Sequence, residues 1–150
     1  MDKGISRFFA RLKRGKMSDF DKFEKNLLKI QNDLKNTAGR SFLKAEGKKL
    51  QKKTLAVARQ KTKKKTGNYL RGIKNGKVYN FDGAFACRVY STAPHAHLIE
   101  YGHKIVDKNK KNIGYQRGLY VFENAKKQFE GEFEQDTSKF IDELWKKNGL

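Results

Sequence analysis

Three histidines and one glutamate lie within nine residues, and these side chain types can bind a metal ion or transfer protons. They are His95, His97, Glu100 and His103. In a helix, however, the rings of a His-x-His pair point about 200° apart, which suits one ion poorly. No second cluster of ligands supports the site, so we expect no metal. We predict that Glu100 and the histidines cap, pair or hydrogen-bond around the turn that follows Glu100.

Cys87 is the only cysteine and the second candidate for chemistry, because a thiolate is a strong nucleophile. It lies between Ala86 and Arg88 in an alternating strand pattern, which favours a buried, inert thiol. A single cysteine forms no intramolecular disulfide. Neither a nucleophile elbow nor a phosphate-binding glycine loop surrounds it. We therefore expect no catalytic residue, no cofactor and no enzymatic activity.

The chain is strongly basic, with 35 Lys and Arg residues against 16 Asp and Glu and a net charge of +19. Such a charge attracts a polyanion or an acidic neighbour. Residues 119–150 carry five basic and seven acidic side chains, a net charge of −2. By contrast, residues 44–77 have Glu46 as their one acid against thirteen bases: Lys44, Lys48, Lys49, Lys52, Lys53, Arg59, Lys61, Lys63, Lys64, Lys65, Arg71, Lys74 and Lys77.

A length of 150 residues suits one domain, here residues 18–150, preceded by a basic arm at 1–17. No apolar run approaches the ~20 residues of a membrane span. Arginines interrupt the apolar residues near the N-terminus, unlike the continuous apolar core of a signal peptide. We expect a protein that stays in the cytoplasm of the cell that makes it and does not enter a membrane.

Periodic apolar residues predict the helices. A short basic amphipathic helix is expected at 3–16, as an arm for a partner or for its own domain. Ser18 is a suitable N-cap for a second helix, whose stripe is Phe20, Phe23, Leu27, Ile30 and Leu34. Residues 37–39 could bend or interrupt it. A third helix follows, with Leu43, Gly47, Leu50, Thr54 and Val57 on one face and lysines on the other.

Residues 69–91 predict three antiparallel strands, at 69–73, 77–81 and 84–91, joined by tight turns at Asn75-Gly76 and Asp82-Gly83. Pro94 then suits the start of a short helix that Gly102 ends. Residues 103–118 are polar and predict a loop with a β-excursion, and a final helix starts at Leu119. The fold class is α+β, with a three- to four-stranded meander on which the C-terminal helix packs.

Two short motifs stand in this frame, and their order is more specific than either motif alone. Thr66, Gly67, Asn68, Leu70 and Arg71 form the first. Ile99, Glu100, Tyr101 and Gly102 form the second, at the end of the short helix. In order, spacing and flanking elements, residues 20–148 resemble the tail-completion proteins of tailed bacteriophages, the family named after gene product ten of the Hong Kong 97 phage.

The resemblance implies a structural virion protein at the head–tail junction or the proximal tail end. It implies a homo-oligomeric ring, a hexamer or a dodecamer, beside neck, tail-terminator, tube or sheath proteins of a phage or a tail-like bacteriocin. Double-stranded DNA in the ring lumen would be contacted without regard to sequence, through phosphates. The lysine-rich helix and the mildly acidic C-terminal helix would give the subunit complementary faces.

Three surfaces are our candidates for partners or DNA: the basic arm, the loop at 103–117, and a lysine face. The alternative is a free, sequence-nonspecific nucleic-acid-binding protein in which Tyr69, Tyr79 and Phe81 stack on bases. We favour the other interpretation of these aromatic residues, in which they pack the strands against helices. The lysines that we assign to an interface or to DNA are Lys48, Lys49, Lys52, Lys53, Lys63, Lys64 and Lys65 of the face, and Lys108, Lys110 and Lys111 of the loop.

Overall fold

The computed structural model describes residues 19–63 and 67–150. The basic arm at 1–17 and the Ser18 cap lie outside the described residues. The described chain begins with two consecutive helices, α2 (Asp19–Lys35) and α3 (Thr37–Lys61). A Cβ at Gly39 would collide with the carbonyl oxygen of Leu34. Glycine therefore lets the two helices meet closely, which explains the bend that the sequence indicates at 37–39.

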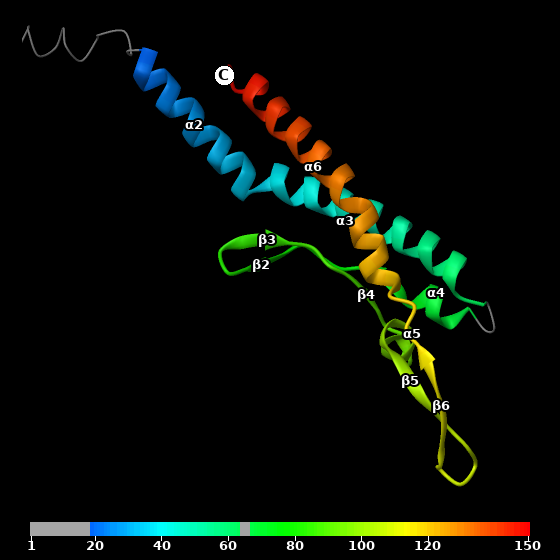
Figure 1. Cartoon of the computed structure of the whole chain (residues 1–150). Helices are drawn as coiled ribbons and strands as arrows, with labels where there is room; N and C mark the ends of the chain where they lie inside the picture. The colour runs from blue at the N-terminus through cyan, green and yellow to red at the C-terminus, as the bar shows by residue number, and fades with distance from the viewer. Residues whose placement is uncertain (1–18, 64–66) are drawn as a thin grey trace, which may run out of the picture.

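The longest element is the C-terminal helix α6 (Val121–Lys147), which lies against α3 and runs in the opposite direction (Figure 1). Phe42 of α3 stacks on Phe140 of α6 with ring centroids 4.4 Å apart. The Phe133 ring of α6 also lies near Phe42, with centroids 6.2 Å apart. The predicted helix is thus confirmed, but its main partner is α3. The first turns of α6 also reach the strands, because Val121 and Ala125 share a core with Ile73 and Val89, so the expected packing on the sheet is confined to this end of the helix.

The hydrophobic core lies where α3 and α6 meet the central strands. Its buried members are Val57 and Ala58 of α3, Ile73, and Val121 and Ala125 of α6. Half-buried side chains surround this cluster. They are Leu55, Tyr69, Leu70, Val89, Leu119 and Phe122. The core is small, so the ends of the long helices and the outer strands extend well beyond it.

The strand predicted at 69–73 is wrong. Asn68–Gly72 forms a short helix, α4, and only Ile73 begins a strand. The reason is the spacing of the apolar residues: Tyr69, Leu70 and Ile73 stand at helical intervals and face one core. The Tyr69-Leu70 pair breaks the alternation that a half-buried strand requires.

The next strands form one interrupted ribbon and not a meander. β1 (Ile73–Asn75) pairs with β4 (Val89–Ser91), and β2 (Tyr79–Phe81) pairs with β3 (Ala84–Ala86), both antiparallel and two-stranded. The predicted turn at Asp82-Gly83 is confirmed, with positive φ at both residues as a type I′ turn requires.

Asn75-Gly76, however, is not a turn. Gly76 N–H donates to the Arg88 carbonyl across the ribbon at 2.8 Å. The Asn75 side chain instead ties the ribbon to α3, because its amide nitrogen donates to the Lys44 carbonyl at 3.5 Å and its oxygen accepts from the Cys87 thiol at 3.1 Å. An Asn-Gly pair is a strong hairpin signal, but here the asparagine bridges two elements.

The predicted short helix is confirmed as α5 (Ala96–Tyr101), and Gly102 follows it with a φ of +86°. Residues 103–117 are then almost entirely a hairpin of β5 (Gly102–Val106) and β6 (Asn112–Arg117). The hairpin projects from the body at the end opposite to α2 (Figure 1). The β-structure predicted as a part of this loop therefore makes up most of the segment.

The α+β class is confirmed: two N-terminal helices, short antiparallel strand pairs and a long C-terminal helix. Among the described residues, no helix has both the length and the apolar character to cross a membrane.

Candidate interaction surfaces

Glu100 caps the N-terminus of α6. Its buried carboxylate accepts hydrogen bonds from the backbone N–H groups of Val121 at 2.8 Å, Phe122 at 3.1 Å and Glu123 at 3.4 Å. The first N–H groups of a helix lack partners within the helix, and its dipole favours a negative charge there. The carboxylate that could have been a metal ligand thus joins α5 to α6 across 20 residues of sequence.

The rest of the second motif fixes the root of the hairpin. Leu119 N–H donates to the Ile99 carbonyl at 2.8 Å, and the Tyr115 hydroxyl donates to the Tyr101 carbonyl at 2.9 Å. Gly102 and Gly118 lie where the two arms of the chain cross, and a Cβ at either would collide with backbone of the other arm. The motif therefore sets the position from which the hairpin leaves the body.

The first motif lies beside the second. Gly67 has a φ of +74° at the start of α4, the conformation expected of it. Leu70 packs against the core, whereas Thr66 lies outside the described residues. Burial raises the pKa of Tyr69 to about 12, and the nearby Glu100 carboxylate contributes to the rise. Tyr69 thus brings the two motifs together, which sequence spacing alone does not reveal.

The histidines do not form a recognisable metal centre. His95 precedes α5, His97 lies on it and His103 lies on β5, and all three side chains are exposed. Within residues 19–63 and 67–150, no group of three or more His, Cys, Asp or Glu residues could hold a metal ion.

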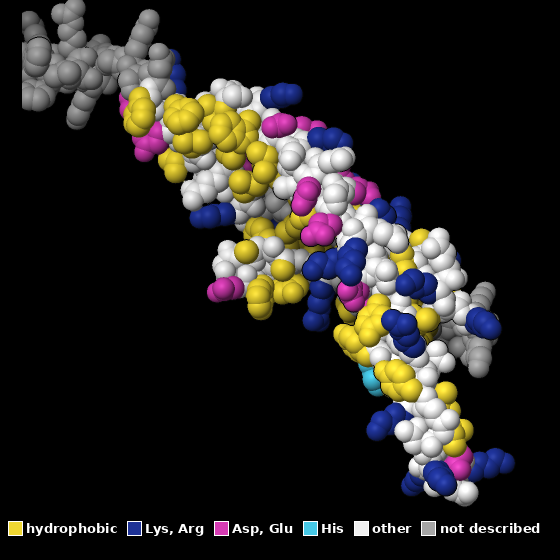
Figure 2. Space-filling model, viewed as in Figure 1, with side chains coloured by type: hydrophobic (Ala, Val, Ile, Leu, Met, Phe, Trp, Pro, Cys, Tyr) yellow, Lys and Arg dark blue, Asp and Glu magenta, His cyan; other side chains and the backbone are white. Residues whose placement is uncertain are grey.

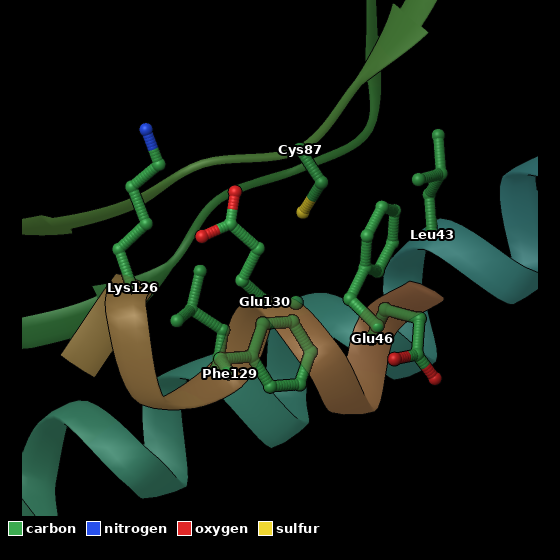
Figure 3. A pocket seen from close by; sticks show the side chains of 9 residues that line it. Leu43, Glu46, Cys87, Lys126, Phe129 and Glu130 are labelled. Atoms are coloured by element: carbon green, nitrogen blue, oxygen red, sulfur yellow. The ribbon is translucent and has the colours of Figure 1, made fainter. Parts of the chain in front are cut away.

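Cys87 faces a hollow of about 260 Å³ between α3, α6 and the ribbon, shown in Figure 3. Burial raises the pKa of the thiol, which also donates to Asn75 Oδ1 at 3.1 Å. Both effects work against a reactive thiolate. Gly47 lets the ribbon approach α3 closely, because a Cβ there would come within 2.7 Å of the Cys87 sulfur. Cys87 therefore packs α3 against the ribbon.

The lysine face divides into two parts. Lys49 Nζ lies 2.6 Å from Asp136 Oδ2, and Lys53 Nζ lies 2.7 Å from Glu132 Oε2, so both lysines pair with α6 of their own chain. The opposite charges of these helices, expected to face neighbouring subunits, thus meet partly within one subunit. Lys48, Lys52 and Lys63 are exposed, Lys64 and Lys65 lie outside the described residues, and Lys108, Lys110 and Lys111 are exposed near the hairpin tip.

Exposed apolar side chains gather at two opposite ends of the molecule (Figure 2), and Tyr79 and Phe81 of β2 are exposed as well, at 40% and 68%. We name the first group the α2 face. Of the apolar stripe of α2, only Ile30 is buried, and Phe20 is 73% exposed. Leu28, beside the stripe, is 52% exposed. The full α2 face is Phe20, Phe23, Leu27, Leu28 and Leu34. The second, which we name the hairpin surface, is the group of exposed apolar side chains on the β5–β6 hairpin, Ile105, Val106, Ile113 and Tyr115. They lie on both faces of the hairpin, because Ile105 pairs with Gly114 whereas Tyr115 pairs with Lys104 at the next position.

The segment at 103–117 was predicted as a partner surface through its lysines, but its exposed apolar side chains were not predicted. Their signal was present, because Ile105, Val106, Ile113 and Tyr115 stand in a segment otherwise rich in lysine and glycine. Apolar residues at strand spacing in a polar segment indicate a hairpin that meets a partner.

The fold is an α+β domain that exposes apolar side chains at both ends. In a comparison with protein families, residues 21–102 match the family described as "Bacteriophage HK97-gp10, putative tail-component". The match spans more than half of the chain, and the chain belongs to this family of phage tail components. No curated protein and no solved structure matched significantly.

Membership defines a structural role in a phage tail, in contact with other virion proteins. The matched residues include both motifs and end at Gly102, where the hairpin begins.

Proposed function

We propose that the chain is a non-enzymatic tail-completion or neck protein, and that its copies join head to tail in a ring at the head–tail junction or the proximal end of the tail. One observation carries the proposal: the α2 face and the hairpin surface lie at opposite ends of one subunit, and each exposes apolar side chains. Two different surfaces that fit one another generate a closed ring when the rotation between copies closes.

The hairpin supports this role because it has few contacts that would stabilise it within its own subunit. Every residue of β6 is exposed, and within residues 19–63 and 67–150 β5 and β6 pair only with one another. A two-stranded hairpin is marginally stable in water unless it packs on a helix or further strands. Its open edges and apolar side chains suit a second chain.

The α2 face is the corresponding surface on the next copy. An amphipathic helix normally buries its apolar stripe, and here most of the stripe faces solvent. Charge neither favours nor opposes the pairing. Residues 102–117 carry five Lys and Arg side chains against one Asp, a net charge of +4, whereas residues 19–35 carry four lysines and four acids, a net charge of zero. Lys147 of α6 lies 3.6 Å from Asp33 of α2.

The expected ring of six or twelve copies stays a prediction, as do its neck, tail-terminator, tube or sheath neighbours. Assembly into the particle would place the protein in the virion. The N-terminal arm is a further candidate contact, and it lies outside the described residues.

The test is particle completion. A phage lacking this gene should give particles that stop at the unjoined head or the unfinished tail, as seen by electron microscopy. Supplying the Ile113→Asp variant should not restore them, because it places a charge in the hairpin contact. The exposed Gln116→Asp change on the same strand is the matched control and should restore them. Complete, infectious particles without the gene would overturn the proposal.

A further inference from the structure

A groove of about 550 Å³ lies between α3 and the β1–β2 arm of the ribbon. Three cations line its α3 wall, Arg40, Lys44 and Lys48, and two line the other wall, Lys74 and Lys77. The remaining lining residues are Ser41, Gln51, Asn75, Gly76 and Val78. Among the described residues that line the groove, five side chains are therefore cationic and none is acidic.

The cations form an ordered strip. Arg40, Lys44 and Lys48 are each four residues apart, so they lie on one side of α3 about 6 Å apart along its axis. All five side chains are exposed. Within the described residues, none of them lies within ion-pair distance of a carboxylate. Lys49 and Lys53, on another side of the same helix, are paired with α6.

Like charges that converge without counter-charges repel one another, and the repulsion is relieved when an anion binds. We propose that this groove binds the phosphodiester backbone of a nucleic acid, independently of base sequence. The inference does not depend on ring formation, because the groove is complete within one subunit.

The composition of the groove favours a nucleic acid over an acidic protein. Protein interfaces have an apolar centre, but Val78 is the only aliphatic or aromatic residue among the ten that line the groove. Interfaces with nucleic acids are more polar and much more positive. A second copy of this chain is also a poor source of negative charge, since its net charge is +19.

The groove has few free groups to read bases. Amide side chains are common readers of base edges, but Gln51 donates to the Ile73 carbonyl at 2.9 Å, and Asn75 bonds to Lys44 and Cys87. The five Lys and Arg side chains of the groove can bind phosphates, which carry no sequence information.

The test compares two variants of the full chain that lose the same charge. The groove variant carries Lys44→Gln, Lys48→Gln, Lys74→Gln and Lys77→Gln. The control variant carries Lys29→Gln, Lys35→Gln, Lys126→Gln and Lys146→Gln, four exposed lysines of α2 and α6 away from the groove. Circular dichroism confirms that both fold. Binding to a labelled random-sequence 30-base-pair duplex, and to one of its strands, is measured by fluorescence anisotropy across a salt series.

We expect the groove variant to bind at least about tenfold more weakly, with the slope of log affinity against log salt reduced by about 3 to 4, since each lost phosphate contact removes nearly one unit. The control variant should keep most of the affinity and slope. Equal weakening of the two variants, or no binding by the wild type at low salt, would overturn the proposal. So would competition by poly-glutamate as effective as that by unlabelled DNA, because the site would then accept an acidic protein.

Discussion

The sequence around Glu100 is compatible with two roles for its carboxylate, a metal ligand and a helix cap. A glutamate among three histidines indicates a metal ligand as readily as a helix cap. The structure gives it four N–H···O contacts with the first turn of α6, to Val121, Phe122 and Glu123. The choice depends on what lies 20 residues further along the chain, and local spacing does not contain that information.

Replacing Glu100 by alanine should therefore destabilise the domain. The change removes the cap from a buried helix end, at a cost of about 2 kcal/mol, which lowers Tm by about 4–8 °C in a chain of this size. Glu100→Gln keeps one acceptor oxygen, and its Tm should lie between those of the wild type and Glu100→Ala. Thermal unfolding followed by circular dichroism measures both.

Glu134→Ala is the matched control, because Glu134 is exposed on the same helix. It should shift stability by no more than about 0.5 kcal/mol. If Glu100→Ala unfolds at the wild-type temperature, the carboxylate does not hold α6 in place.

At the scale of elements, the helices were predictable and the strand pairing was not. The stripes that marked α2, α3 and α6 depend on local period, and all three helices formed. The prediction of a meander was wrong because Tyr69 and Leu70 follow helical spacing and because Asn75 bonds to α3. Both depend on contacts between distant parts of the chain. The same limit hid the basic groove, although the four-residue spacing of Arg40, Lys44 and Lys48 was in the sequence.

The α3–α6 ion pairs predict a pH dependence. The hydrogen bond from Lys49 holds the pKa of Asp136 below its usual value, and hydrogen bonds to Asp136 and Glu46 raise that of Lys49. A carboxyl group with a lowered pKa in the folded state stabilises the fold above its unfolded pKa of about 3.9, and this contribution is lost as pH falls through the folded pKa. The lysine contribution is lost only at high pH, as pH rises through its raised pKa.

Asp136→Asn should therefore lose stability at neutral pH and show a shallower decline below about pH 4 than the wild type. Urea unfolding at a series of pH values measures the difference. Asp142→Asn, on the same helix, has no such partner in the described residues and serves as the control. An Asp136→Asn profile parallel to the wild type throughout would show that the pair does not couple folding to pH.

At the scale of the whole molecule, the structure places two unlike apolar surfaces at opposite ends and a basic groove on the body between them. A head-to-tail assembly would bury both ends. Net charge and the C-terminal acids indicated an assembling subunit from the sequence. The positions of the α2 face and the hairpin surface depend on how α3, α5 and α6 are arranged, and so the structure was needed to locate them.

Head-to-tail assembly can be tested directly by mixing two variants, each with one disabled surface. Leu28→Asp disables the α2 face, and Ile113→Asp disables the hairpin surface; Gln31→Asp and Gln116→Asp are the matched controls on the same elements. Analytical ultracentrifugation should show rings for the wild type and both controls, and monomers for each disabled variant alone. An equimolar mixture of the disabled variants should give dimers of one copy of each and nothing larger, because one intact contact remains. Monomers only in that mixture, or rings formed by either disabled variant alone, would contradict the account.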